Sequence, residues 1–225
     1  MLNGKSFVAA LAIAATASVA SPALAQGNDA GGVYVGAETG VVMAGSGNLG
    51  GDAVVGQKAG FDLGGTVGYR FAQTPSGNFR VELEGHYSQS DLDTGRPYGA
   101  FAADAYNGEV QTAGAMVNAY YDLSQLGGRV VPYVGAGLGF ENVDLDARGS
   151  AASYHGNDTV FAYQAIAGIE YRIDNHVSVT LDGRYFDMDK PRFHTAPAGI
   201  AVTPEPTASY DLDGFKGMVG VRYTF

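Results

Sequence analysis

The last eleven residues read Phe215-Lys-Gly-Met-Val-Gly-Val-Arg-Tyr-Thr-Phe225 and alternate between two kinds of position. Successive side chains of a β-strand point to opposite faces, so this stretch predicts a strand with two different sides. One side is apolar and the other carries two cations and a hydroxyl group. A strand with an apolar face that runs to the final residue is typical of a barrel surrounded by lipid. The apolar side holds Phe215, Gly217, Val219, Val221, Tyr223 and Phe225, and the other side holds Lys216, Met218, Gly220, Arg222 and Thr224.

The same alternation predicts seven further strands in the rest of the chain. Three of them are rich in glycine and alanine and show the pattern less strongly. Each segment is close to the roughly 9–11 residues that a tilted strand needs to cross a bilayer. The seven segments lie near residues 32–42, 61–71, 79–88, 111–121, 131–140, 161–172 and 177–185.

The predicted connections alternate between short and long. The short ones span 72–78, 123–129 and 173–176, whereas the long ones span 43–58, 89–108, 142–158 and 188–209. Short turns at one end and long loops at the other are typical of an outer-membrane barrel. We therefore predict an all-β fold, an eight-stranded antiparallel up-and-down transmembrane β-barrel. An even number of strands places both mature termini on the periplasmic side.

Charge indicates which face of the strands lies outside. A soluble β-sandwich or barrel with the same alternation points its apolar face inward and exposes polar residues, so alternation alone does not say which face is outside. Burying the charges of the polar face in a soluble core would be costly, and exposing the aromatic side chains of the other face to water would invite aggregation. The aromatic side chains gather near both ends of the apolar face, as expected at two membrane interfaces. The polar face is therefore predicted to line the lumen. Its charged members are Glu38, Asp62, Arg70, Arg80, Glu82, Glu84, Glu170, Asp182, Arg184, Lys216 and Arg222.

The first 25 residues have the features of a secretory signal peptide. Lys5 precedes a short apolar run, and Ala23-Leu-Ala25 matches the small-residue cleavage pattern before Gln26. A retained transmembrane helix is the alternative, but the run is too short and too rich in alanine and serine to anchor well. We predict a signal peptide over 1–25 and one barrel domain over 26–225.

Composition excludes several classes of function. The chain has a net charge of −10, and removal of 1–25 takes away Lys5 and no acid, leaving 12 basic and 23 acidic side chains. Nucleic-acid binding needs clustered lysine and arginine, so it is not expected. The chain contains no cysteine, which excludes disulfides and thiol chemistry.

Four motifs resemble those of the small outer-membrane β-barrel family that includes the OmpA transmembrane domain, OmpX and the opacity-type surface antigens. They are Tyr34-Val-Gly-Ala-Glu-Thr-Gly40, Asn118-Ala-Tyr-Tyr-Asp122, Pro132-Tyr-Val-Gly-Ala-Gly-Leu-Gly139 and Val219-Gly-Val-Arg-Tyr-Thr-Phe225. The resemblance implies a Gram-negative outer membrane, with its lipids as partners. It also implies that the barrel-assembly machinery recognises a signal made of Val219, Val221, Tyr223 and Phe225. The periplasmic domain of OmpA is not expected here.

The inward charges predict an ionic network that fills the lumen. Eight strands enclose only enough space for side chains, so a plugged lumen is the first interpretation and a narrow conducting pore is the alternative. The central network is predicted to set Glu82 and Glu84 against Arg184, Lys216 and Arg222, with Asp182 on the same face.

Four Asp-x-Asp pairs occur where predicted strands meet the long connections. Carboxylate oxygens suit Ca²⁺ or Mg²⁺, so the pairs are weak candidates for bridging lipid headgroups through cations. The simpler interpretation is that strands extending beyond the bilayer need polar outward residues, and no metal or cofactor is expected. The pairs are Asp91 with Asp93, Asp144 with Asp146, Asp187 with Asp189, and Asp211 with Asp213.

Two His-x-Ser pairs raise the question of enzymatic activity, because some small outer-membrane barrels are lipid A deacylases. His86 with Ser88 and His176 with Ser178 have the spacing of one strand face, but both pairs are predicted to face the lumen, away from lipid. No catalytic residue is therefore expected.

Structural or surface-interaction work remains as the predicted function. The protein would maintain envelope integrity and present its loops to an extracellular ligand, through adhesion or recognition. A narrow porin for small solutes is the alternative, and a lipid A-modifying enzyme is the third possibility.

Overall fold

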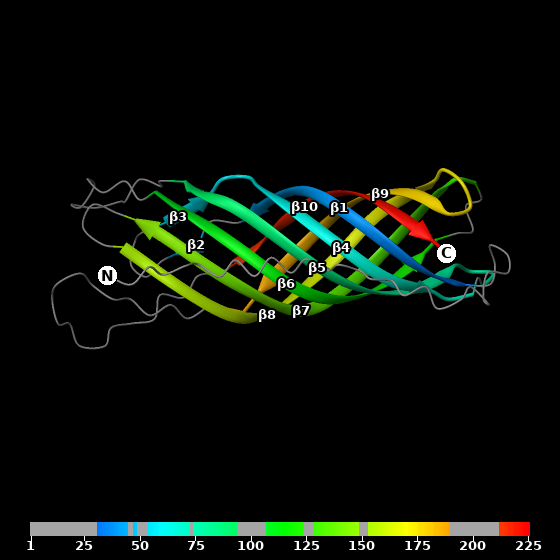
Figure 1. The fold of residues 1–225 in the computed structure, drawn as a ribbon, viewed down its shortest axis with the longest axis horizontal. Coiled ribbons are helices and arrows are strands. Elements are labelled where there is room, and N and C mark those ends of the chain that lie inside the picture. The colour runs from blue at the N-terminus through cyan, green and yellow to red at the C-terminus, as the bar shows by residue number, and fades with distance from the viewer. Residues whose placement is uncertain are drawn as a thin grey trace.

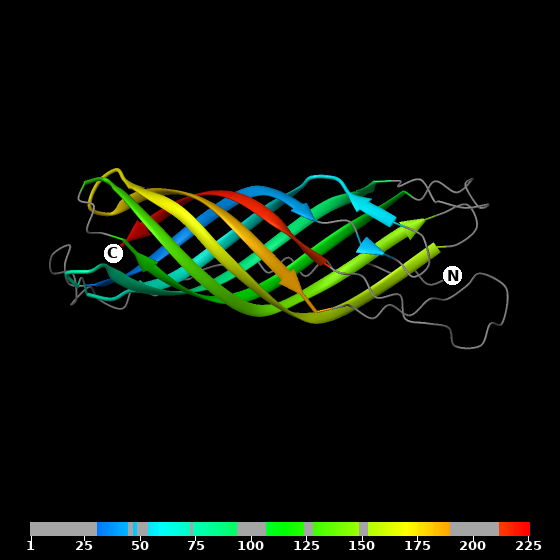
Figure 2. The same cartoon turned by 180° about the vertical axis from the view of Figure 1, so that it is seen from behind.

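The structure is a computed structural model in which eight long antiparallel strands form a closed barrel (Figures 1 and 2). It describes residues 31–44, 47–48, 54–72, 74–93, 107–123, 128–148, 153–189 and 212–225. The predicted signal peptide over 1–25 lies outside the described residues. No helix in the described part of the chain is long and apolar enough to span a membrane.

The barrel strands follow one another around the wall in chain order, as predicted. They are β1 (Gly32–Ala44), β4 (Gly60–Arg70), β5 (Asn78–Asp93), β6 (Asn107–Asp122), β7 (Val130–Arg148), β8 (Ser153–Arg172), β9 (Val177–Met188) and β10 (Leu212–Thr224). A small pair, β2 (Gly47–Asn48) and β3 (Val54–Gln57), precedes β4, and β3 extends the sheet beside the end of β5.

Strand β10 closes the barrel by pairing with β9 on one side and with β1 on the other. Tyr223 is opposite Val177 in β9 and opposite Val35 in β1. The backbone N–H of Phe225 donates to the carbonyl of Val33 at 3.0 Å, so the pairing continues to the last residue. The alternating stretch at the end of the sequence is therefore the closing strand.

The two ends of the barrel differ. We call the end with the short β4–β5, β6–β7 and β8–β9 connections the turn end, and the opposite end the loop end. Gly32 and Thr224 both lie at the turn end, because Gly32 is paired with Arg70, where β4 ends, and Tyr34 is paired with Thr224. In the β4–β5 turn, Gly77 has φ of +145° and a side chain there would meet the carbonyl oxygen of Asp122, so glycine is required.

The apolar face of each strand points outward. Along β10, Phe215 is 59% exposed and Val221 is 55% exposed, whereas Lys216 is 6% exposed. Aromatic rings pair on the outer surface near both ends, as predicted for two membrane interfaces. Pairs at the turn end include Phe79 with Tyr121 and Tyr223 with Phe225; pairs at the loop end include Phe140 with Phe161 and Tyr185 with Phe215.

Strands β7 and β8 extend much further than the sequence predicted. The alternation suggested that 142–158 is a long loop, but β7 runs to Arg148 and β8 starts at Ser153. The outward residues of this extension are polar, so the apolar signal ends before the pairing does. Asn142 and Asn157 exchange side-chain amide hydrogen bonds of 3.0 and 2.8 Å across the two strands.

Candidate functional site

The lumen is the part of the structure where charged side chains gather. Strand alternation turns every second residue inward, and the inward charges are almost fully buried. All eleven charges predicted for the lumen face inward together with His86, which was also expected there, and the structure adds Asp122 and Glu141. The charged residues with at most 7% exposure are Asp62, Arg80, Glu82, Glu84, His86, Asp122, Glu141, Glu170, Asp182, Arg184, Lys216 and Arg222.

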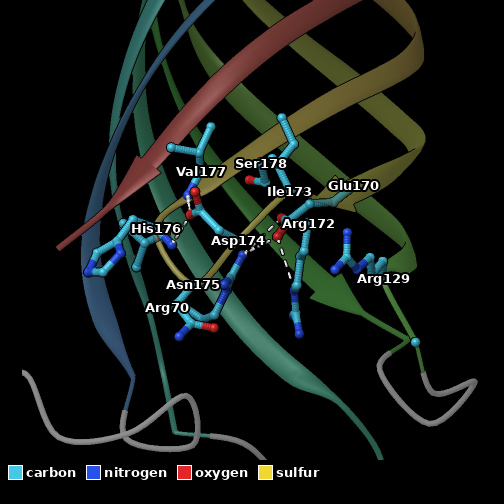
Figure 3. Close-up of a pocket in the computed structure, with 12 residues that line it drawn as sticks. Arg70, Arg129, Glu170, Arg172, Ile173, Asp174, Asn175, His176, Val177 and Ser178 are labelled. Carbon is cyan, nitrogen blue, oxygen red and sulfur yellow. Dashed lines mark hydrogen bonds and ion pairs between the residues drawn. The ribbon is translucent and has the colours of Figure 1, made fainter.

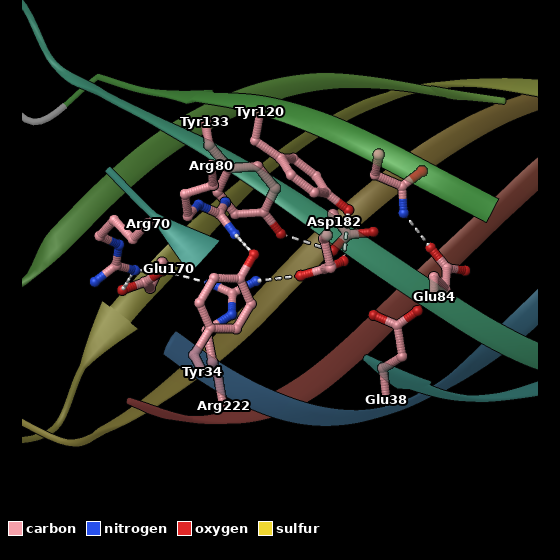
Figure 4. Close-up of polar contacts among 12 residues, drawn as sticks. Tyr34, Glu38, Arg70, Arg80, Glu84, Tyr120, Tyr133, Glu170, Asp182 and Arg222 are labelled. Carbon is pink, nitrogen blue, oxygen red and sulfur yellow. Dashed lines mark hydrogen bonds and ion pairs between the residues drawn. The ribbon is translucent and has the colours of Figure 1, made fainter. Parts of the chain in front are cut away.

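Glu170 is the centre of the cluster at the turn end. Arg70 Nη2 donates to both of its carboxylate oxygens, at 2.9 and 2.8 Å. Arg222 Nη1 donates to Glu170 Oε2 at 2.5 Å, and Arg172 Nε lies 3.4 Å from Glu170 Oε1. Three guanidinium groups thus share one buried carboxylate, which leaves positive charge around it; Figure 4 shows two of them, Arg70 and Arg222, with Glu170.

Arg80 forms the second part of the turn-end cluster. Its Nε donates to both oxygens of Asp122, at 2.8 and 3.0 Å. Its guanidinium carbon also lies 4.5 Å from the ring centre of Tyr120 and 5.1 Å from that of Tyr133, which are cation–π distances. Tyr34 lies beside Arg80, and the ring occupies the space where a side chain of Gly68 would be. Sequence reasoning missed these three inward tyrosines.

Arg184 is the centre of a second cluster, halfway along the lumen. Its three nitrogens contact three carboxylates: Nη2 lies 2.7 Å from Glu38, Nη1 lies 2.9 Å from Glu84, and Nε lies 2.7 Å from Asp182. Figure 4 shows Glu38 and Glu84 further along the barrel than Arg70 and Glu170. A guanidinium fork suits this contact because its donors have fixed directions.

Two amides extend the central cluster to β6 and β8. Asn118 Nδ2 donates to Glu84 Oε2 at 2.6 Å, and Gln164 Nε2 donates to Asn118 Oδ1 at 2.9 Å. Both amides are buried, so they satisfy carboxylate and amide oxygens that water would otherwise have to reach.

The predicted partner of the lysine differs from the one in the structure. Lys216 Nζ lies 2.6 Å from Asp62 rather than against Glu82 or Glu84. Glu82 lies 3.7 Å from Arg222, one of its predicted partners, and also accepts a hydrogen bond of 3.0 Å from the Tyr120 hydroxyl. The reason is geometric, because the tilt of the strands decides which inward residues reach the same height.

His86 lies between two carboxylates of the central cluster. Its Nε2 is 3.0 Å from Glu141 Oε1 and its Nδ1 is 3.5 Å from Glu84 Oε1. Glu141 reaches it across β6 because Gly114 has no side chain; a Cβ there would come within 2.1 Å of the Glu141 carboxylate. Glu141 falls between the strand predicted near 131–140 and the loop predicted over 142–158, and it was not among the predicted lumen charges.

The His-x-Ser pairs do not form one site. His86 and Ser88 are buried in the lumen, as predicted. His176 was also expected to face the lumen, but its exposed ring stacks on outward-facing Tyr223, with ring centres 5.8 Å apart. Ser178 is buried; Figure 3 labels both His176 and Ser178. The turn before β9 rotates His176 out of the strand alternation.

The described residues of the Asp-x-Asp pairs lie on the outer surface at the loop end. Asp187 accepts a hydrogen bond from the Tyr163 hydroxyl, and Asp213 accepts one of 3.5 Å from Tyr185. Asp91, Asp144 and Asp189 are exposed. Asp211 and the side chains of Asp93 and Asp146 lie outside the described residues. Among the residues that the structure describes, no group of three or more potential ligands could hold a metal ion.

Comparison with known proteins shows which family the chain belongs to. The family model for the outer membrane protein beta-barrel domain matches residues 9–225. This chain belongs to that family. It is an outer-membrane protein, and both the closed barrel and the outward apolar face agree with that location. No curated protein matches the chain significantly.

Several solved structures share the fold. The outer membrane protein OprG from Pseudomonas aeruginosa is 19% identical, with a TM-score of 0.60 over 88% of this chain and 98% of that one. Neisserial surface protein A is 20% identical, with a TM-score of 0.54 over 86% and 97%. The outer membrane protease OmpT from Escherichia coli is 6% identical, with a TM-score of 0.51 over 87% and 96%. At these identities the likeness extends to the fold alone.

Proposed function

We propose that this protein is a closed outer-membrane barrel that stabilises the envelope and presents its loop end to the surroundings. The observation that supports this function is the filling of the lumen by the two charged clusters. Every barrel strand contributes to the central part, through Glu38, Asp62, Glu84, Asn118, Glu141, Gln164, Arg184 and Lys216.

The dimensions of the barrel favour a plug over a pore. Eight strands leave an interior that side chains can fill. Arg184 bridges β1, β5 and β9 by direct contacts of 2.7–2.9 Å, so a solute would have to separate buried ion pairs to pass. Separating a buried pair leaves uncompensated charge, which is strongly unfavourable.

The turn end is proposed to face the periplasm, with both mature termini there. Val219, Val221, Tyr223 and Phe225 are exposed on the outer face of the closing strand, where the barrel-assembly machinery could contact them. Outer-membrane lipids would surround the apolar face. An extracellular ligand would meet the loop end.

Liposome swelling tests the proposal against a porin. Liposomes containing the folded protein should not swell in arabinose or in a larger sugar, whereas liposomes with a known general porin should. Uptake of the smaller sugar alone would replace the proposal with a narrow porin. Lipid A mass from cells with and without the protein should be identical, and any change would indicate an enzyme.

A deletion strain tests the envelope role. Loss of the protein should increase sensitivity to detergent and to large antibiotics, and the wild-type copy should restore resistance. Unchanged sensitivity would contradict a role in envelope integrity and leave recognition at the loop end as the remaining function.

A further inference from the structure

The turn end of the lumen opens into a cavity of about 240 Å³. The end of β4, the start of β7, the β8–β9 turn and the end of β10 surround it (Figure 3). Arg70, Arg129 and Arg172 line this cavity together with Glu170 and Asp174. Three guanidinium groups therefore meet two carboxylates in a protein whose net charge is −10.

Both carboxylates are already engaged. Glu170 accepts hydrogen bonds from Arg70 and also from Arg222, which adds a fourth guanidinium behind the cavity wall. Asp174 Oδ1 accepts the backbone N–H groups of His176 and Val177, each at 2.7 Å. These hydrogen bonds hold the pKa of the Asp174 carboxyl below its ordinary value of 3.8, so it stays ionised and committed to the turn.

Donor groups remain available to a ligand. Arg129 is exposed, and Arg172 meets Glu170 only through Nε while its side chain keeps 31% exposure. Arg70 lines the cavity with a side chain that is 13% exposed, but its Nη2 is bound to Glu170 and its Nε is buried, 3.6 Å from Asp122 Oδ2, so it supplies positive charge rather than a free donor. Planar guanidinium groups donate pairs of hydrogen bonds to carboxylate and phosphate groups, and phosphate, with more acceptor oxygens, can be shared by several of them.

The cavity also lies close to the membrane interface. The β8–β9 turn is beside outward-facing Tyr223, on which His176 stacks, and the exposed side chain of Ile173 lies in the same turn. Aromatic rings of barrels mark the level of the lipid headgroups. In helical membrane proteins, basic pockets near the membrane interface bind the head groups of anionic lipids.

We propose that the cavity at the turn end binds a phosphate group through Arg129 and Arg172, with Arg70 at its base. The phosphate belongs either to the headgroup of an anionic phospholipid or to free inorganic phosphate. This site goes beyond the proposed envelope function and does not depend on whether the lumen conducts.

The test uses the full-length protein in nanodiscs, with the arginine side-chain ¹⁵N resonances as the readout. One arm titrates inorganic phosphate into nanodiscs of phosphatidylcholine. The other arm replaces part of the phosphatidylcholine with phosphatidylglycerol and adds no phosphate. Arg129→Gln and the double variant Arg129→Gln/Arg172→Gln remove the donors, and Lys58→Gln removes one exposed cation at the loop end as a matched control.

We expect a saturable shift of the arginine resonances in at least one arm. Saturation with inorganic phosphate identifies free phosphate as a ligand, and saturation with phosphatidylglycerol alone identifies the lipid. Arg129→Gln should weaken binding roughly tenfold and the double variant roughly a hundredfold, whereas Lys58→Gln should not change it. No saturable shift in either arm, or an equal loss in Lys58→Gln, overturns the proposal. The exposed Arg129 can be replaced without touching the lumen clusters, so its variant separates binding from folding.

Discussion

Replacing Arg184 with methionine tests whether water reaches the ion pairs in the lumen. The side chain of Arg184 is 2% exposed and contacts Glu38, Glu84 and Asp182 at 2.7–2.9 Å. Methionine keeps the stem of the side chain and removes the charge. Three carboxylates then lose their shared cation in a space that water reaches poorly.

The size of the effect distinguishes a plug from a water-filled pore. Removing one partner of a buried ion pair costs about 3–5 kcal/mol, whereas an exposed pair contributes only about 0–1 kcal/mol. We expect Arg184→Met to lower the free energy of unfolding by about 3–5 kcal/mol. The loss should not be three times larger, although three ion pairs are broken, because the carboxylates can take up protons. Lys58→Met, at an exposed cation, should change it by less than about 0.5 kcal/mol.

The assay is reversible urea unfolding in lipid vesicles. The chain contains no tryptophan, so the folded fraction is followed by gel mobility of unheated samples and by circular dichroism. Adding Glu84→Gln to Arg184→Met removes one uncompensated charge and should recover about 0.5–3 kcal/mol. A loss below about 1 kcal/mol for Arg184→Met, with no recovery in the double variant, would show that solvent screens these pairs.

Three further predictions concern the wall, a turn and insertion. Gly68→Ala should destabilise the barrel by about 1–3 kcal/mol in the same assay, because the new Cβ would lie 2.3 Å from the Tyr34 ring. Gly183→Ala meets no atom within 4 Å and should be neutral; an equal loss there would refute the packing explanation. Asp174→Ala should destabilise the β8–β9 turn at neutral pH. The difference in free energy of unfolding from wild type should disappear as the pH falls below 3.8 and then through the lowered pKa of Asp174 in the folded state. A difference that persists in acid would contradict this. Deleting Phe225 should reduce outer-membrane levels of the protein, and normal levels would contradict its role in insertion.

The barrel could be predicted because its signals are local. Alternation in the closing strand and along residues 177–185 records the two environments on either side of one strand, and no distant contact is needed to see it. The burial of Arg184 and Lys216 follows from the same pattern. The extension of β7 was not predicted, for the converse reason. Its outward residues beyond Phe140 lie outside the lipid, so they are polar and the alternation is lost from the sequence.

Partners across the lumen could not be predicted. Lys216 meets Asp62 at a separation of 154 residues, and which inward residues share a height depends on the tilt and register of all eight strands. Contacts that reach across an intervening strand are equally difficult to predict from the sequence. Glu141 reaches His86 only because Gly114 leaves the space empty, and a glycine in a sequence does not reveal which side chain will lie over it.

Single-channel recording in a planar bilayer tests the closed lumen most directly. The wild-type protein should insert and show no steady open level in concentrated potassium chloride. The double variant Arg184→Ala/Glu84→Ala removes the centre of the plug and should conduct. A stable open conductance of the wild-type protein, unchanged in the double variant, would contradict the ionic plug.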